Sequence, residues 1–347
     1  MDGDFYVDYS KLDTLQIKII SEKFDEHMVI KGQAGTGKSL VALHKFGRIQ
    51  DDKKAMLIVF TKALKKYFKD GFQALGIDEG KVFYYQEWPE KEVDYIFVDE
   101  CQDFNREQIQ KFVSHSKICY FFGDDAQTIY EWRTTVQSVE ESAKMLGVRP
   151  VELFKNHRLT KQNARIAEYV AKTKDLVARC EKDGALPRLF TGATVEEQLD
   201  DMIRIIRNNG LTRVGILLPM NTESKARDSY DTKSHISVQF VKEYLDANGM
   251  PSEAKMSDDY TDKNELDFNS PLPKILTWTS AKGLQFNDVF IPFCENPYEE
   301  SRRKTLYVAI TRAWNRLYIG YTGQINPVFL PPADSDYYEH VGQLKAI

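Results

Sequence analysis

The sequence lacks the features that mark membrane, secreted and metal-cluster proteins. No apolar run approaches the about 18 residues of a transmembrane helix, and the acidic N-terminal segment MDGDFYVDYSKLD has no apolar stretch typical of a signal peptide. The cysteines Cys101, Cys119, Cys180 and Cys294 form no CxxC pair and have no histidine at metal-ligand spacing. We therefore expect reduced thiols, a cytoplasmic location and no membrane contact.

An excess of positive charge is also absent. The net charge is −5 at pH 7 and the pI is about 5.8, so any surface that binds nucleic acid must be a local patch. The chain has 347 residues, of which 42% are hydrophobic. This length and composition suit a large buried core and predict two domains.

Short apolar segments alternate with longer segments of helical periodicity throughout the chain. The predicted strands are 28–31, 55–60, 81–85, 95–98, 117–122, 151–154, 187–190, 213–218, 274–279, 288–293 and 316–321. The predicted helices are 38–49, 62–75, 104–114, 135–146, 161–180, 195–208, 235–248 and 302–313. Continuous apolar strands separated by helices predict an α/β fold with mainly parallel sheets, covered by helices on both faces.

Two α/β lobes follow from this alternation. We predict an N-terminal lobe over residues 1–153 and a C-terminal lobe over 154–325. The tail over 326–347 is interrupted by prolines and then mildly amphipathic, and we expect it to pack on a lobe rather than dock a partner. The polar segment 221–234 and the acidic segment 257–269 are predicted to be exposed loops.

A phosphate-binding motif directly follows the first predicted strand. Residues 32–39 read GQAGTGKS and open a helix, as in the P-loop, whose backbone N–H groups cradle phosphates. Lys38 is expected to reach the β- and γ-phosphates and Ser39 to hold Mg²⁺. The residues expected to surround ATP are Gly32, Ala34, Gly35, Thr36, Gly37, Lys38 and Ser39. The alternative, a glycine-rich structural turn, does not account for the flanking strand and helix.

Three acids end the apolar segment DYIFVDECQDF at 94–104. In P-loop NTPases a second strand carries an Asp to the Mg²⁺ ion, and a neighbouring acid can deprotonate the attacking water. We predict these roles for Asp99 and Glu100. The alternative is that the acids cap the helix expected near Phe104, and we assign that role to Asp103 alone.

Further segments resemble, in order, the motifs of superfamily 1 helicases of the UvrD, Rep and PcrA type. They are LDTLQ (12–16), VFTKALKKYF (59–68), VDECQDF (98–104), FFGDDAQTIYEWR (121–133), NHR (156–158), TWTSAKGLQF (277–286) and LYVAITRAWNRLYI (306–319). The resemblance spans roughly residues 12–320. It implies two RecA-like lobes, ATP hydrolysis with Mg²⁺, and 3′ to 5′ movement on single-stranded nucleic acid, DNA rather than RNA.

The resemblance also implies roles for residues outside the P-loop. Gln16 is expected to read the adenine and Gln127 to sense the γ-phosphate. Arg158 and Arg312 resemble arginine fingers that stabilise the transition state, although an arginine on a helix is more often a solvated charge.

Departures from the family pattern fall near the nucleotide base. His157 stands where the family commonly has a stacking Tyr, and Leu40 where it often has an Arg. Gln285 replaces a Glu that touches the ribose. His157 and Gln285 can still stack or form hydrogen bonds, so we expect ATP binding with looser base selectivity.

The resemblance assigns a second group of residues to nucleic-acid contacts: Thr61, Lys62, Tyr130, Trp132 and Thr279. Stacking of aromatic side chains on bases is sequence-tolerant, but Trp132 alternatively suits a core. The other lysines of the basic run 61–69 equally suit a solvated helix face. Thr279 replaces the family's histidine.

The two inserted subdomains of full-length members have no room here. Residues 69–97 number 29 and residues 159–276 number 118, which the predicted lobe elements largely use. We therefore expect a near-minimal motor, with a possible protein partner supplying duplex separation or nuclease activity. The rival hypotheses are an ATP-gated switch that controls a partner such as a nuclease and, less well supported without an NKxD motif, a small-molecule kinase or GTPase.

Overall fold

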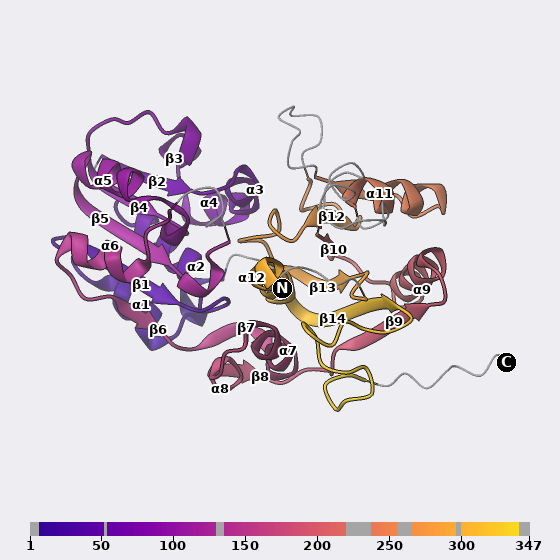
Figure 1. Ribbon diagram of the computed structural model, residues 1–347. Helices are drawn as coiled ribbons and strands as arrows, with labels where there is room; N and C mark the ends of the chain where they lie inside the picture. Colours follow the sequence, from indigo (N-terminus) through magenta and orange to yellow (C-terminus); the bar gives the residue numbers. More distant parts are fainter. Residues whose placement is uncertain are drawn as a thin grey trace. The chain divides into compact units, whose positions relative to one another are not determined.

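The computed structural model describes residues 7–51, 54–129, 135–219, 237–255, 266–295 and 300–339. The chain divides into two compact units, the first ending at His157 and the second beginning at Arg158. Each unit contains a large sheet flanked by helices (Figure 1). No helix in the described ranges is long and apolar enough to cross a bilayer.

The first unit contains a six-stranded parallel sheet with the strand order β3-β2-β4-β5-β1-β6. Its strands are β1 (Met28–Gly32), β2 (Ala55–Val59), β3 (Val82–Tyr84), β4 (Val93–Val98), β5 (Ser116–Gly123) and β6 (Val151–Leu153). Its helices are α1 (Thr14–Ser21), α2 (Lys38–Gly47), α3 (Lys62–Tyr67), α4 (Lys69–Leu75), α5 (Arg106–Ser114) and α6 (Val139–Leu146). All six strands predicted for this half are present, which confirms the α/β class.

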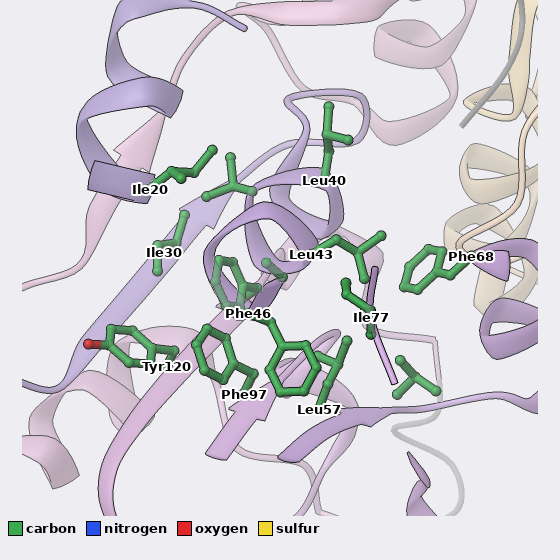
Figure 2. Packing of buried hydrophobic residues seen from close by; sticks show 14 of the residues in the cluster. Ile20, Ile30, Leu40, Leu43, Phe46, Leu57, Phe68, Ile77, Phe97 and Tyr120 are labelled. Carbon is green, nitrogen blue, oxygen red and sulfur yellow. The ribbon is translucent and has the colours of Figure 1, made fainter. Parts of the chain in front are cut away.

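Alternate residues of the strands pack on opposite faces of this sheet, as the strand pleat requires. Ile30 and Leu57 belong to the hydrophobic cluster around Phe46 of α2, which Figure 2 shows. Val29 and Ile58 belong to a second cluster that includes residues of α5 and α6. Burial on both faces explains why the strands read as unbroken apolar runs.

Helix α5, which follows β4 and the acidic residues after it, starts later than the sequence predicts. α5 begins at Arg106 because the side chain of Asn105 accepts a hydrogen bond from the Gln108 N–H, and Gln108 returns one to Asn105. The prediction that Asp103 caps this helix is therefore wrong. Asp103 is buried in the 3₁₀ turn Cys101–Asp103.

Two other helices also differ in their limits. α6 begins at Val139 rather than near 135, because Ser138 and Glu141 form a reciprocal capping box. The predicted helix 62–75 is divided at Phe68, although Phe68 keeps a helical backbone. This division is a local irregularity between α3 and α4.

The second unit contains another six-stranded parallel sheet, with the order β11-β12-β10-β13-β14-β9. Its strands are β9 (Arg188–Gly192), β10 (Val214–Leu218), β11 (Glu253–Ala254), β12 (Lys274–Thr277), β13 (Phe286–Ile291) and β14 (Ala313–Thr322). Its helices are α7 (Lys161–Ala171), α8 (Leu176–Arg179), α9 (Val195–Asn208), α11 (Val238–Ala247) and α12 (Arg303–Ile310). A separate pair, β7 (Asn156–Thr160) and β8 (Cys180–Lys182), was not predicted.

Helices α9 and α11 share a hydrophobic cluster with the second sheet. Leu199 of α9 and Val241 of α11 belong to it together with Phe290 and Tyr318, whose rings stack with centroids 4.2 Å apart. The predicted helix 161–180 ends early, because Lys172 takes a left-handed backbone with φ 54°.

The segment after β14, drawn in yellow in Figure 1, packs on the second unit. Tyr338 is buried, and Glu339 pairs with Arg188 of β9 through both side chain and backbone. The guanidinium of Arg165 lies 4.4 Å from the ring centroid of Tyr337. The tail thus packs as predicted up to residue 339, and 340–347 lie outside the described residues, as do 221–234 and most of 257–269.

Candidate nucleotide-binding site

The phosphate-binding motif forms the connection between β1 and α2. Gly35 and Gly37 have φ of 87° and 83°, a left-handed backbone that glycine adopts without strain. A Cβ at Gly37 would also lie 2.5 Å from the side-chain nitrogen of Gln16. Glycine is therefore required at Gly37 both by backbone conformation and by space.

The ammonium of Lys38 is held inside this loop. Lys38 is only 6% exposed, and its Nζ donates hydrogen bonds to the carbonyl oxygens of Gly32 (2.7 Å) and Gln33 (3.3 Å). A nearly buried cation beside a helix N-terminus is a strong attractor for a phosphate.

Ser39 and Asp99 meet at the carboxyl ends of β1 and β4. The Ser39 hydroxyl donates to Asp99 Oδ2 at 2.6 Å, and Asp99 is fully buried. Burial and then the neighbouring Glu100 raise the pKa of Asp99 to about 7. Its other oxygen, Oδ1, has no hydrogen-bond partner among the residues that the structure describes.

The donor set at this point fits Mg²⁺. A buried carboxylate oxygen without a partner is costly unless a cation or donor meets it. Mg²⁺ binds through one or two protein oxygens together with phosphate oxygens and water, and Asp99 and Ser39 supply such oxygens beside the P-loop.

Glu100 lies at the head of a chain of buried hydrogen bonds. It has a left-handed backbone with φ 55°, and its Oε2 accepts from the Gln102 side chain at 2.6 Å. Gln102 Oε1 accepts from the Asp124 N–H at 2.9 Å, and Asp124 Oδ2 accepts from Gln127 Nε2 at 2.7 Å. The chain connects the end of β4 to the turn after β5.

Sequence reasoning singled out Glu100 and Gln127 but missed Gln102. The available signal was a polar residue two positions after Glu100, in a segment that is otherwise buried. Gly123 makes the close approach possible, because a Cβ there would lie 2.8 Å from Gln102 Oε1.

Gln16 and His157 reach the P-loop from opposite ends of the first unit's sequence. Gln16 closes a capping box with Asp13 and donates to the Thr36 carbonyl at 3.1 Å. His157 Nε2 lies 2.9 Å from Asp13 Oδ2. Partial burial acts to raise the pKa of Asp13, but hydrogen bonds from Gln16 and His157 outweigh it and lower the pKa.

Three predicted residues come together within the second unit. Arg158 Nε donates to Gln285 Oε1 at 2.9 Å, and its Nη1 lies 3.5 Å from the Thr311 carbonyl. The Arg312 side chain is buried and donates to the carbonyls of Val308 (2.9 Å) and Leu284 (3.3 Å). Arg312 is thus a built-in part of the unit rather than a solvated charge.

Three of the predicted nucleic-acid residues have local partners in the described structure. Thr61 caps α3 by accepting from the Leu64 N–H, and Lys62 Nζ lies 2.7 Å from Glu87 Oε1. The Thr279 hydroxyl lies 2.9 Å from that of Thr277. Tyr130 and Trp132 lie outside the described residues.

The β1–loop–α2 segment with its GQAGTGKS sequence has the order of elements and the sequence pattern of a P-loop. The family model for the UvrD/REP helicase N-terminal domain matches residues 56–145, and that for the UvrD-like helicase C-terminal domain matches residues 274–319. By sequence, one segment of each unit is therefore similar to the UvrD helicases.

One curated relative and two solved structures are also similar to parts of this chain. A probable DNA helicase II homologue from Mycoplasma pneumoniae is 33% identical over 136 residues, which cover 34% of this chain and 19% of that protein. The C-terminal domain of a possible DNA helicase from Lactobacillus plantarum has a TM-score of 0.37 at 20% identity, covering 52% of this chain and 96% of that one. The arterivirus nonstructural protein 10 helicase has a TM-score of 0.46 at 16% identity, covering 90% and 61%. The chain thus spans about a fifth of the length of the curated relative that it matches.

Proposed function

We propose that this chain is an ATPase that couples hydrolysis to binding of, and 3′ to 5′ movement on, single-stranded nucleic acid, DNA in preference to RNA. The observation that carries the ATPase assignment is the pair Ser39 and Asp99 beside the P-loop, with Asp99 Oδ1 buried and without a partner in the described structure. The UvrD-type sequence in both units supports dependence on nucleic acid.

In this proposal each side chain near the P-loop has a chemical task. The loop N–H groups and Lys38 bind the ATP phosphates, and Ser39 and Asp99 hold Mg²⁺. When bound, Mg²⁺ neutralises charge on the β- and γ-phosphates. Glu100 orients the attacking water and accepts its proton, and Gln127 responds to the γ-phosphate.

The remaining predicted residues act on the nucleoside and on the transition state. We assign contacts with the base and ribose to Gln16, His157 and Gln285. Arg158 and Arg312 supply positive charge to the transferring phosphoryl group, an effect of about 10³–10⁵ in rate where arginine fingers have been removed.

Nucleic acid is assigned to a separate set of side chains, namely Thr61, Lys62, Tyr130, Trp132 and Thr279. Lys62 is exposed, and its partner Glu87 is exposed as well, so a nucleic-acid phosphate can replace Glu87 at little cost. A protein partner that supplies duplex separation or nuclease activity completes the proposal.

Two substitutions test the ATPase assignment. Glu100→Gln keeps the size of the side chain but removes the proton acceptor, so ATP binding should persist while kcat falls by about 10²–10⁴. Lys38→Ala should weaken ATP binding itself. Binding is followed with a fluorescent ATP analogue and hydrolysis by phosphate release.

Glu107→Gln, on the exposed side of α5, is the matched control for Glu100→Gln. It should hydrolyse ATP at the wild-type rate. Unchanged hydrolysis in both Glu100→Gln and Lys38→Ala would show that the P-loop region does not carry the reaction.

A further inference from the structure

Two neighbouring residues at the end of the first unit form hydrogen bonds with the P-loop. Asn156 Nδ2 donates to the Ala34 carbonyl at 2.6 Å, and the backbone N–H of His157 donates to the Gly35 carbonyl at 3.0 Å. Asn156 is fully buried. The two contacts therefore hold two successive carbonyl groups of the loop.

Because a peptide group is planar, the bonds to these two carbonyls also fix the directions of the N–H groups that follow them. In a trans peptide the C=O and the following N–H lie in one plane and point in opposite directions, and the described chain has no cis peptide. Fixing the Ala34 carbonyl therefore aims the Gly35 N–H away from Asn156. Fixing the Gly35 carbonyl does the same for the Thr36 N–H, which in the described structure makes a long contact of 3.3 Å to the Gln33 carbonyl.

The loop needs such an external hold. Gly35 and Gly37 give it a left-handed backbone at two positions, and glycine peptides rotate more freely than others. Among the described residues Lys38 donates hydrogen bonds to the carbonyls of Gly32 and Gln33, so its bonds do not fix the next two peptides. Asn156 and His157 contact the peptides that Lys38 leaves untouched.

We propose that Asn156 is a positioning residue for phosphate binding, which with the His157 N–H orients the Gly35 and Thr36 N–H groups toward the ATP phosphates. This inference rests on the proposed ATP binding and assigns Asn156 a task that the motif comparison does not. In this proposal both hydrogen bonds to the loop carbonyls persist when nucleotide binds. Asn156 itself does not touch the nucleotide.

The same segment links the loop to a proposed transition-state residue. Asn156 and His157 open strand β7, and Arg158 is the next residue of that strand. Asn156 and His157, two consecutive residues of β7, are hydrogen-bonded to the loop. Nucleotide that reduces the motion of the loop therefore also reduces the motion at the start of β7.

Asn156→Ala and Asn163→Ala form a matched pair of variants. Each residue is a fully buried asparagine whose Nδ2 donates to a backbone carbonyl, but Asn163 bonds to Asn315 in the second unit. Asn156→Ala should raise the Kd for ADP with Mg²⁺ and the KM for ATP about tenfold, the size expected for one lost hydrogen bond, with kcat within about twofold of wild type.

Asn163→Ala should leave the Kd and KM at wild-type values even if it lowers the melting temperature as much. An unchanged Kd in Asn156→Ala, or an equal rise in both variants, would overturn the proposal. Asn156→Asp keeps the side-chain volume and removes the donor, so it replaces the alanine variant if that variant does not fold.

The wild-type protein gives a test that needs no variant. Backbone amide exchange of His157, followed by NMR, should slow on addition of ADP and Mg²⁺ because the loop and β7 tighten together. Equal or faster exchange in the nucleotide complex would overturn the proposal. Wild-type protein that binds ADP but does not hydrolyse ATP would instead refute the proposed ATPase and leave the positioning test intact.

Discussion

Gln102 connects the ends of β4 and β5 through hydrogen bonds. It is fully buried and bonds to the Glu100 carboxylate with its amide nitrogen and to the Asp124 N–H with its oxygen. Asp124 in turn accepts from Gln127. Glu100, the proposed base, and Gln127, the proposed γ-phosphate sensor, are therefore held by one continuous set of bonds.

Replacing Gln102 should separate catalysis from binding. Gln102→Leu removes both bonds at similar volume, so the Glu100 carboxylate loses its orientation and kcat should fall about tenfold or more, while the Kd for ADP stays unchanged. The free energy of unfolding should fall by about 1–3 kcal/mol, because the Asp124 N–H loses its partner. Steady-state kinetics and urea denaturation measure the two effects.

Gln198→Leu is the control for this change. Gln198 is also fully buried and bridges the Phe293 N–H and the Thr322 hydroxyl in the second unit. It should lose stability without losing kcat per folded molecule. Equal losses of kcat in the two variants would remove the special role of Gln102.

Single residues were predictable from sequence where a motif fixes both their type and their spacing. Lys38, Ser39 and Asp99 follow strands that are recognisable as apolar runs, and the structure places Lys38 within the P-loop and Ser39 beside Asp99. Gln102 and Asn156 were missed because their partners come from other parts of the chain, 22 and 122 residues away. Such pairings depend on the tertiary fold.

Among the elements, α1 and α2 are joined through one buried lysine. Lys45 of α2 is fully buried, and its Nζ donates to the carbonyls of Ile19 (2.8 Å) and Glu22 (3.1 Å) at the end of α1. The Nζ also lies 4.3 Å from the ring centroid of Phe24. Lys45 thus caps the helix whose first turn carries Gln16.

This lysine makes stability depend on pH. Burial lowers the pKa of Lys45 from 10.5 to about 8. Between these values the folded protein has released the proton while the unfolded chain still binds it, so the free energy of unfolding rises with pH. Relative to Lys45→Met, wild type should gain about 2 kcal/mol between about pH 7.5 and about pH 9.5.

Urea denaturation of both proteins across this range measures the difference. Taking the difference cancels the contribution of tyrosines and other lysines, which both proteins share. A wild-type advantage that stays flat or falls with rising pH would contradict the lowered pKa.

Helices and strands were predictable from the sequence where a local run of residues determines them. The eleven predicted strands all form, since each is a compact apolar run. Helix starts were misplaced where a capping side chain decides them, as at Asn105, although Ser138 and Glu141 carry a readable capping signal. Strand β7 was missed because NHRLT has no apolar alternation, and its sheet depends on pairing with β8.

The whole molecule combines two parallel-sheet units of similar design. The first carries the P-loop with Ser39 and Asp99, and the second carries Arg158, Gln285 and Arg312 within hydrogen-bond reach of one another or of shared neighbours. The net charge of −5 leaves nucleic-acid binding to local features such as Lys62. In the proposed function, ATP hydrolysis in this chain depends on single-stranded nucleic acid.

The most direct test is the ATP hydrolysis rate of wild type with single-stranded DNA, single-stranded RNA or duplex, at roughly 50 mM and 200 mM salt. We expect the highest rate with single-stranded DNA, and a half-saturating DNA concentration that rises with salt, because phosphate contacts release counterions. An ATP hydrolysis rate that does not change with any nucleic acid but changes with a protein partner would instead indicate an ATP-gated switch. No hydrolysis in the presence of single strands would contradict the account.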